Sequence, residues 1–294
     1  MTTQARCAFV RTVILGTGAV VALSGCVLRG PLTNAFGFRP KNIRSERAAP
    51  QAWGWTDARL DTISRVDSAG GLLAWFGPAP ENAPRCGGAL LLHGKGKNRA
   101  QLLPLARAMQ AAGFAVLVPD YRGYGGTDGV PSTSGMFDDA SLAYHSLRTR
   151  LGDSVTPIVV VGHSMGTALA ARLTRENKPA ATVYMSPFTR ISSLVRSRAG
   201  AIGPRLFDTT AFAFNPLDDA AAAPGRALVV VAGRDLLIRK SDSDAFIAAL
   251  PSGSSVVRDP KSFHNGVVRS ALVMRAVSDT MRAWTRCQRE PPAN

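Results

Sequence analysis

One stretch of this chain passes from a strand pattern into a helix pattern without a loop between them, and a serine stands at the junction. Residues 158–161 are all β-branched, and Gly162 and Gly166 lie two positions before and after Ser164. A serine in so sharp a turn crowds its neighbours, so glycine is needed at both flanking positions. The turn lifts the Ser164 hydroxyl above the sheet edge, next to the N–H of Met165 at the helix start. The pattern predicts an α/β fold with Ser164 as the nucleophile; the alternative is an ordinary turn with a capping serine.

Strand and helix patterns alternate through the rest of the chain. Further apolar runs predict strands at residues 59–66, 72–76, 88–94, 114–120, 182–186, 226–232 and 254–257. Alternation of this kind predicts a mostly parallel, eight-stranded sheet with helices on both faces, opened by an antiparallel pair. Residues 191–219 contain only short helical patterns and predict a minimal cap.

The first 26 residues have the features of an export signal. Arg6 and Arg11 come without an acidic residue, and the apolar run 12–23 is too short to span a bilayer comfortably. The ending Leu-Ser-Gly-Cys resembles the lipobox of bacterial lipoproteins, which implies cleavage before Cys26 and acylation of that cysteine, for example with palmitate. An ordinary cleaved signal peptide and an uncleaved anchor are the alternatives.

This reading divides the chain into three parts. Residues 1–25 are the predicted signal peptide, 26–56 a tether and lead-in, and 57–290 one α/β domain. The resemblance places the protein in the bacterial envelope, anchored to a membrane. Val27 after Cys26 indicates the outer membrane, facing the periplasm, if the cell is Gram-negative.

The formal net charge is +15 at pH 7. Such a charge suits anionic lipid head groups, and it adds to the membrane affinity of an acyl chain. Nucleic acid is the rival partner, but the arginines are scattered and are not interleaved with aromatic residues, so no nucleic-acid partner is expected. A solvated arginine-rich surface is the simplest interpretation. The sequence sets no oligomeric state.

Two cysteines remain once Cys7 and Cys26 are assigned to the leader and the lipid anchor. Cys86 precedes the strand at 88–94, and Cys287 lies in the last predicted helix. An even pair in an oxidising compartment is typical of a disulfide, and two separate buried thiols are the alternative. No Cys-x-x-Cys or His/Cys cluster indicates a metal.

A serine nucleophile needs a base, an acid that orients the base, and donors for the oxyanion. Of the four histidines, His264 alone follows the last predicted strand in a loop, and we predict it as the base. Asp235 follows the strand at 226–232 and is the predicted acid. Three other aspartates are fallback candidates for that role: Asp242, Asp244 and Asp259.

The second oxyanion donor is expected in the loop after the strand at 88–94. Gly94 allows a tight turn, so the backbone N–H of Lys95 is the predicted donor beside that of Met165. His93 is expected to pack beneath this loop. Lys95, Lys97 and Arg122 near the mouth of the site suggest an anionic substrate.

Taken together, these motifs resemble the α/β-hydrolase superfamily, and most closely its small-capped Bem46-like and ABHD17-like serine hydrolases. The motifs are His93-Gly94, Asp120-Tyr121-Arg122-Gly123-Tyr124-Gly125, Gly162-His163-Ser164-Met165-Gly166, Ser186-Pro187-Phe188, Gly233-Arg234-Asp235 and Phe263-His264-Asn265. The resemblance covers residues 60–285 and implies the triad Ser164, Asp235 and His264, with Lys95 and Met165 as oxyanion donors. Lys95-Gly96-Lys97 departs from the residues usual in relatives.

The expected activity is hydrolysis of carboxylic esters or thioesters through an acyl-enzyme on Ser164, with no metal or cofactor. One alternative is an amide hydrolase of the serine aminopeptidase type. Another is an envelope lipoprotein that kept the fold and only binds a partner. The substrate expected from the motifs is a small acyl ester or thioester.

Overall fold

The computed structural model describes residues 49–56, 58–64, 71–152, 155–199 and 213–287. The predicted signal peptide, most of the tether and Cys26 lie outside these residues. None of the helices within them is long and apolar enough to cross a bilayer.

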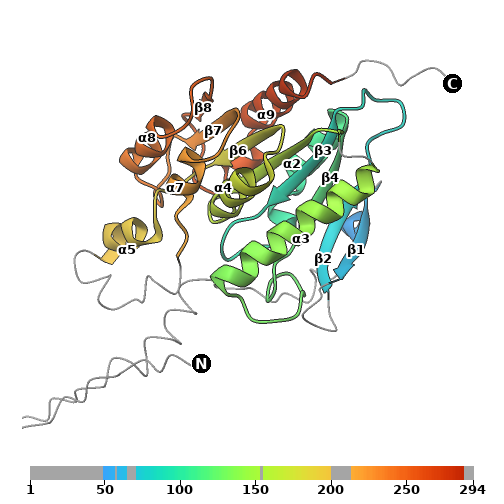
Figure 1. Cartoon of the computed structure of the whole chain (residues 1–294), viewed down its shortest axis with the longest axis horizontal. Coiled ribbons are helices and arrows are strands. Elements are labelled where there is room, and N and C mark those ends of the chain that lie inside the picture. The colour runs from blue at the N-terminus through green and yellow to red at the C-terminus, as the bar shows by residue number, and fades with distance from the viewer. Residues whose placement is uncertain (1–48, 57, 65–70, 153–154, 200–212, 288–294) are drawn as a thin grey trace, which may run out of the picture.

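One sheet of eight strands organises the fold (Figure 1). The strands are β1 (Arg59–Ser64), β2 (Gly71–Gly77), β3 (Gly87–Leu92), β4 (Phe114–Pro119), β5 (Ile158–His163), β6 (Ala181–Met185), β7 (Ala227–Ala232) and β8 (Ser255–Asp259). Their order across the sheet is β1-β2-β4-β3-β5-β6-β7-β8. β1 and β2 form an antiparallel pair, β2 joins β4 in antiparallel register, and the remaining pairs are parallel. The predicted topology of the sheet is therefore confirmed.

The central parallel strands are almost entirely apolar because helices cover both of their faces. Every residue of β4, β5, β6 and β7 is buried. The longer helices are α2 (Leu103–Ala111), α3 (Thr133–Leu151), α4 (Gly166–Asn177), α5 (Ile191–Ala199), α7 (Pro216–Ala221), α8 (Lys240–Ala248) and α9 (Ala271–Trp284), and three 3₁₀ turns are η2 (Pro50–Trp53), η3 (Arg99–Leu102) and η5 (Val267–Arg269). Alternate strand residues divide the core into two clusters, one under α3, α4 and α8 and the other under α2 and α9.

Apolar spacing predicts helices that begin at Asp138 and Val267, but α3 begins earlier, at Thr133, and α9 begins later, at Ala271. Ser132 caps α3, because its hydroxyl oxygen accepts the N–H of Gly135 at 3.0 Å. Ser270 caps α9 in the same way through the N–H of Val273 at 3.3 Å, and it separates α9 from η5. A cap depends on one serine and its backbone angles, which apolar periodicity does not report.

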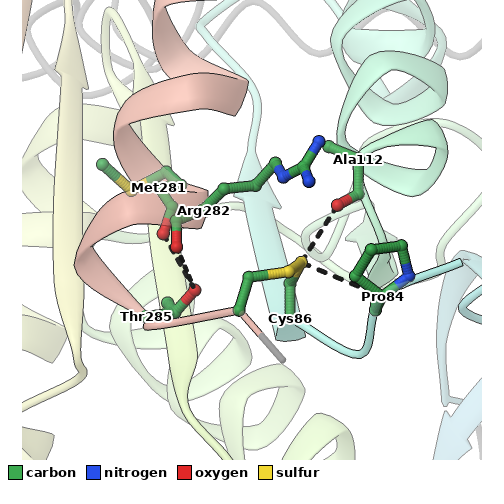
Figure 2. Close-up of a disulfide and its surroundings, with 7 residues drawn as sticks. Pro84, Cys86, Ala112, Met281, Arg282 and Thr285 are labelled. Carbon is green, nitrogen blue, oxygen red and sulfur yellow. Dashed lines mark hydrogen bonds between the residues drawn. A yellow bond between two sulfur atoms is a disulfide. The ribbon is translucent and has the colours of Figure 1, made fainter. Parts of the chain in front are cut away.

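Cys86 and Cys287 form a disulfide across 201 positions of sequence. Figure 2 shows it between the segment leading into β3 and the end of α9. Cys86 is buried and belongs to the core cluster beneath α2 and α9. Of the two alternatives left open by the sequence, the structure has the bonded one.

Candidate active site

The elbow around Ser164 explains its two glycines in atomic terms. Ser164 has φ = 53°, a left-handed conformation that a serine adopts at a cost. A Cβ at Gly162 would lie 2.2 Å from the carbonyl oxygen of Gly166, and one at Gly166 would lie 2.2 Å from that of Leu92. Both contacts are with backbone, which cannot move aside. The turn is therefore possible only with glycine at both positions.

Three predicted residues meet above the carboxyl ends of β5, β7 and β8. Nε2 of His264 lies 2.8 Å from Oγ of Ser164, and Nδ1 lies 2.7 Å from Oδ2 of Asp235. An ionised carboxylate only accepts hydrogen bonds, so Nδ1 carries the proton and Nε2 accepts the Ser164 hydroxyl proton. The arrangement can move a proton from the serine to the histidine.

The loop after β7 holds the Asp235 carboxylate. The N–H groups of Leu237 and Ile238 each donate to its Oδ1 at 2.8 Å. Burial acts to raise the pKa of Asp235, but the hydrogen bond and charge of His264 and these two N–H groups outweigh it, so the pKa lies below its ordinary value. Asp235 is thus kept as an anion beside the imidazole.

The three fallback aspartates have other partners. Asp242 accepts the Thr189 hydroxyl at 2.9 Å, and Asp244 pairs with Lys240 and Arg258. Asp259 accepts the Ser262 hydroxyl at 2.5 Å. Of the four candidates, Asp235 is therefore the one that contacts His264.

The loop after β3 lies directly against the elbow, as the oxyanion prediction requires. A Cβ at Gly94 would be 3.2 Å from Cβ of Ser164. The N–H of Gly94 donates to Oε1 of Gln101 at 3.3 Å, so that donor is already in use. Met165 is buried and is the N-cap residue of α4, with helical backbone angles. The positions of Lys95 and Met165 are compatible with their predicted roles as backbone donors.

A second histidine, His163, supports the site from below. Its ring is fully buried, and its Nε2–H donates to the backbone carbonyl oxygen of His264 at 3.0 Å. Burial, followed by the nearby His264, lowers its pKa to about 3, so the ring is neutral at physiological pH. The sequence showed His163 only as a residue of the elbow, since the partner lies 101 positions away.

Gln101 and Asn265 form another connection that the sequence did not reveal. Nε2 of Gln101 donates to Oδ1 of Asn265 at 3.0 Å, while Oε1 of Gln101 accepts the Gly94 N–H. One side chain thus joins the predicted oxyanion loop to the loop that carries His264.

Side chains of the loop after β4 bind other parts of the protein and so support the site. Asp120 accepts the backbone N–H of Arg99 at 2.7 Å and also pairs with its guanidinium. The Tyr121 hydroxyl donates to the His93 carbonyl oxygen at 3.0 Å, and the His93 ring is buried as predicted. These contacts brace the strand end below Gly94.

The suggestion that Arg122 draws an anionic substrate needs correction. Its guanidinium and backbone N–H bind the carboxylate of Asp139 at 2.7–3.1 Å. Because Asp139 neutralises the charge of Arg122 within the protein, only Lys95 and Lys97 of the three residues, both exposed, still suggest an anionic substrate.

In the described part of the chain, no group of three or more His, Cys, Asp or Glu side chains could hold a metal ion.

Comparison with known proteins finds similarity to hydrolases over parts of the chain. The family described as "Serine aminopeptidase, S33" matches residues 84–211. An uncharacterised protein of Mycobacterium tuberculosis is 28% identical over 251 residues, which are 84% of this chain and 87% of that protein. Lysophosphatidylserine lipase ABHD12 of Gallus gallus is 35% identical over 125 residues, which are 40% of this chain but only 32% of the lipase.

Solved structures share the fold at low identity. An esterase of Pyrococcus furiosus superposes with a TM-score of 0.67 and 17% identity over 84% of this chain and 97% of its own. A soluble variant of monoglyceride lipase from Saccharomyces cerevisiae superposes with a TM-score of 0.63 and 16% identity, over 78% and 95%. These likenesses establish the α/β-hydrolase fold.

Proposed function

We propose that this chain, which has the α/β-hydrolase fold, is a serine hydrolase that cleaves carboxylic ester or thioester bonds through an acyl-enzyme on Ser164. The observation that carries the proposal is the hydrogen-bonded series from Ser164 through His264 to Asp235. Esterases and lipases among the similar proteins support ester substrates over amides.

In the first half of the reaction, Oγ of Ser164 bonds to the substrate carbonyl carbon while Nε2 of His264 takes the hydroxyl proton. The carbonyl oxygen becomes an oxyanion, which the N–H groups of Met165 and Lys95 stabilise. The bond to the leaving alcohol or thiol then breaks, and the leaving group takes its proton from His264. Asp235 stabilises the imidazolium and holds its tautomer without accepting the proton.

In the second half, water attacks the acyl carbon of the ester on Ser164, and His264 takes the proton of that water. The bond to Oγ breaks, and His264 returns the proton to Oγ. The products are a carboxylic acid and the free serine. His163 assists by fixing the backbone of His264, and Gln101 by fixing the loop of Gly94.

Labelling with a fluorophosphonate probe tests the proposal. The wild type should react, Ser164→Ala should not, and His264→Ala should lose about 10³-fold or more in rate. Ser252→Ala, which changes an exposed serine in a loop, should label like the wild type. An unlabelled wild type that melts cooperatively would contradict the proposal and favour the binding-module alternative.

A substrate screen separates the esterase from the peptidase alternative, which the matching family's description favours. p-Nitrophenyl esters of increasing acyl length and the corresponding acyl thioesters are compared with aminoacyl p-nitroanilides. Esters or thioesters should give the higher kcat/KM. A preference for the anilides would move the assignment to amide hydrolysis.

The location of the protein is also a proposal. The chain is exported and anchored by acylation of Cys26, with the hydrolase domain in the periplasm if the cell is Gram-negative. Feeding cells an alkyne-labelled palmitate should label the wild type and not Cys26→Ser, whereas Cys7→Ser should remain labelled. Label retained in Cys26→Ser would contradict lipidation at that residue.

A further inference from the structure

Two neighbouring loops carry the proposed acid and base, residues 233–239 after β7 and 260–266 after β8. They are bonded to each other, since the N–H of Gly233 donates to the carbonyl of Asp259 at 2.7 Å and that of Arg234 to the carbonyl of Ser262 at 2.9 Å. The acid is Asp235 on the first loop, and the base is His264 on the second. Any surface that these loops contact therefore lies beside the reacting groups.

Large apolar side chains on these loops face outward. Leu236 is 85% exposed, Phe263 54% and Leu237 37%, whereas the next residue, Ile238, is 4% exposed. Leu236 and Leu237 directly follow Asp235, and Phe263 directly precedes His264. The backbone N–H groups of Leu237 and Ile238 bind the Asp235 carboxylate and so fix the conformation of this loop. The exposure of Leu236 and Leu237 is therefore a consequence of the hydrogen bonds that hold Asp235 in place.

Basic side chains accompany the apolar ones. Arg234 on the first loop and Lys261 on the second are exposed. The nearby aspartates face inward, because Asp235 binds His264 and Asp259, the last residue of β8, binds Ser262. Exposed apolar residues between cations suit the boundary of an anionic bilayer, where apolar groups enter the acyl region and cations meet the head groups.

We propose that these five residues, Leu236, Leu237, Phe263, Arg234 and Lys261, form a patch that docks the surface beside Asp235 and His264 on an anionic lipid bilayer. Docking there would bring the ester of a membrane lipid to Ser164. A second copy of the chain is a poorer occupant, since the same cations would face each other. The lipid substrate rests on the proposed function, but the docking itself does not.

The position of the patch relative to the membrane can be measured in the full chain. The measurement does not depend on how the N-terminus associates with lipid. Phe263→Trp is made in a Ser164→Ala background and mixed with phosphatidylcholine–phosphatidylglycerol vesicles whose acyl chains carry bromine. The emission of the parent Ser164→Ala protein is subtracted. Val155→Trp is the matched control, because Val155 is 87% exposed but lies just before the amino end of β5, whereas the patch follows the carboxyl ends of β7 and β8.

The proposal predicts about two- to threefold greater bromine quenching for the tryptophan introduced at position 263 than for the one at 155, because only the patch reaches the acyl boundary. Arg234→Ser with Lys261→Ser should lower that quenching on anionic vesicles. Arg226→Ser with Arg282→Ser, exposed arginines at the far ends of β7 and α9, should not. Each variant should melt within a few degrees of its parent.

Equal quenching at both positions would overturn the proposal. So would a blue-shifted emission at position 263 before lipid is added, together with a dimer in sedimentation, because a second copy would then cover the patch. The serine nucleophile is absent throughout, so failure to dock and failure to hydrolyse are separate results.

Discussion

His163 is a titratable group that the fold keeps uncharged next to the nucleophile. Its folded pKa of about 3 lies below the ordinary value of 6.5. Between these two values the unfolded chain binds more protons than the folded one. The free energy of unfolding therefore falls as the pH falls through this window, and this contribution is constant above it.

His163→Gln should remove that pH dependence while keeping an N–H for the His264 carbonyl. Between pH 6 and pH 5 the wild type should lose about 1.2 kcal/mol more than the variant, a little less than the effect of one full proton because the unfolded histidine is only partly protonated near pH 6. Urea unfolding at several pH values measures this difference. Parallel curves for the two proteins would mean that His163 titrates normally in the fold.

A single substitution also tests Asp235 as the acid that orients His264. Asp235→Asn should lower kcat on an ester by about 10³- to 10⁴-fold, because an amide no longer holds the imidazole as its Nδ1–H tautomer or stabilises its charge. Asp242→Asn, whose native carboxylate binds Thr189, should keep kcat within a few-fold. Equal losses in both variants would remove Asp235 from its proposed role.

At the scale of elements, the most demanding junction is that of β5 and α4. Gly166→Ala should cost at least about 3 kcal/mol of unfolding free energy, because its Cβ would meet the Leu92 carbonyl. Gly266→Ala is the control. Its φ is −75°, and the nearest atom to an added Cβ is 3.4 Å away, so it should be neutral or slightly stabilising. Chemical denaturation measures both variants, and similar costs would contradict the steric explanation.

Those elements also show what sequence can and cannot predict. The strands were predictable because runs such as residues 158–161 must be buried on both sides, and the triad because residues at strand ends converge on one edge. The contact of Gln101 with Asn265 spans 164 positions and has no local pattern. The early start of α3 depends on Ser132 alone.

At the scale of the whole molecule, the disulfide joins the entry to the sheet with its last helix. Cys86→Ala with Cys287→Ala should lower the unfolding free energy by about 2–5 kcal/mol, since the unfolded chain is no longer closed into a long loop. A fall in Tm of roughly 5–15 °C is expected for a domain of this size. Calorimetry with and without reductant checks it: reductant should lower the Tm of the wild type and not that of the variant. An unchanged wild-type Tm would mean that the bond contributes little.

The same disulfide sets an order of events when the chain is made. Cys287 follows all the strands and helices described here. The ribosome must therefore add 201 further residues after Cys86 before the disulfide can form. At common rates of synthesis that wait is about 10 to 40 s. During it the thiol of Cys86 is open to oxidation or to a wrong partner, unless β3 and α2 bury it first. Burial of Cys86 before Cys287 is made would thus protect a bond that only the end of the chain can complete.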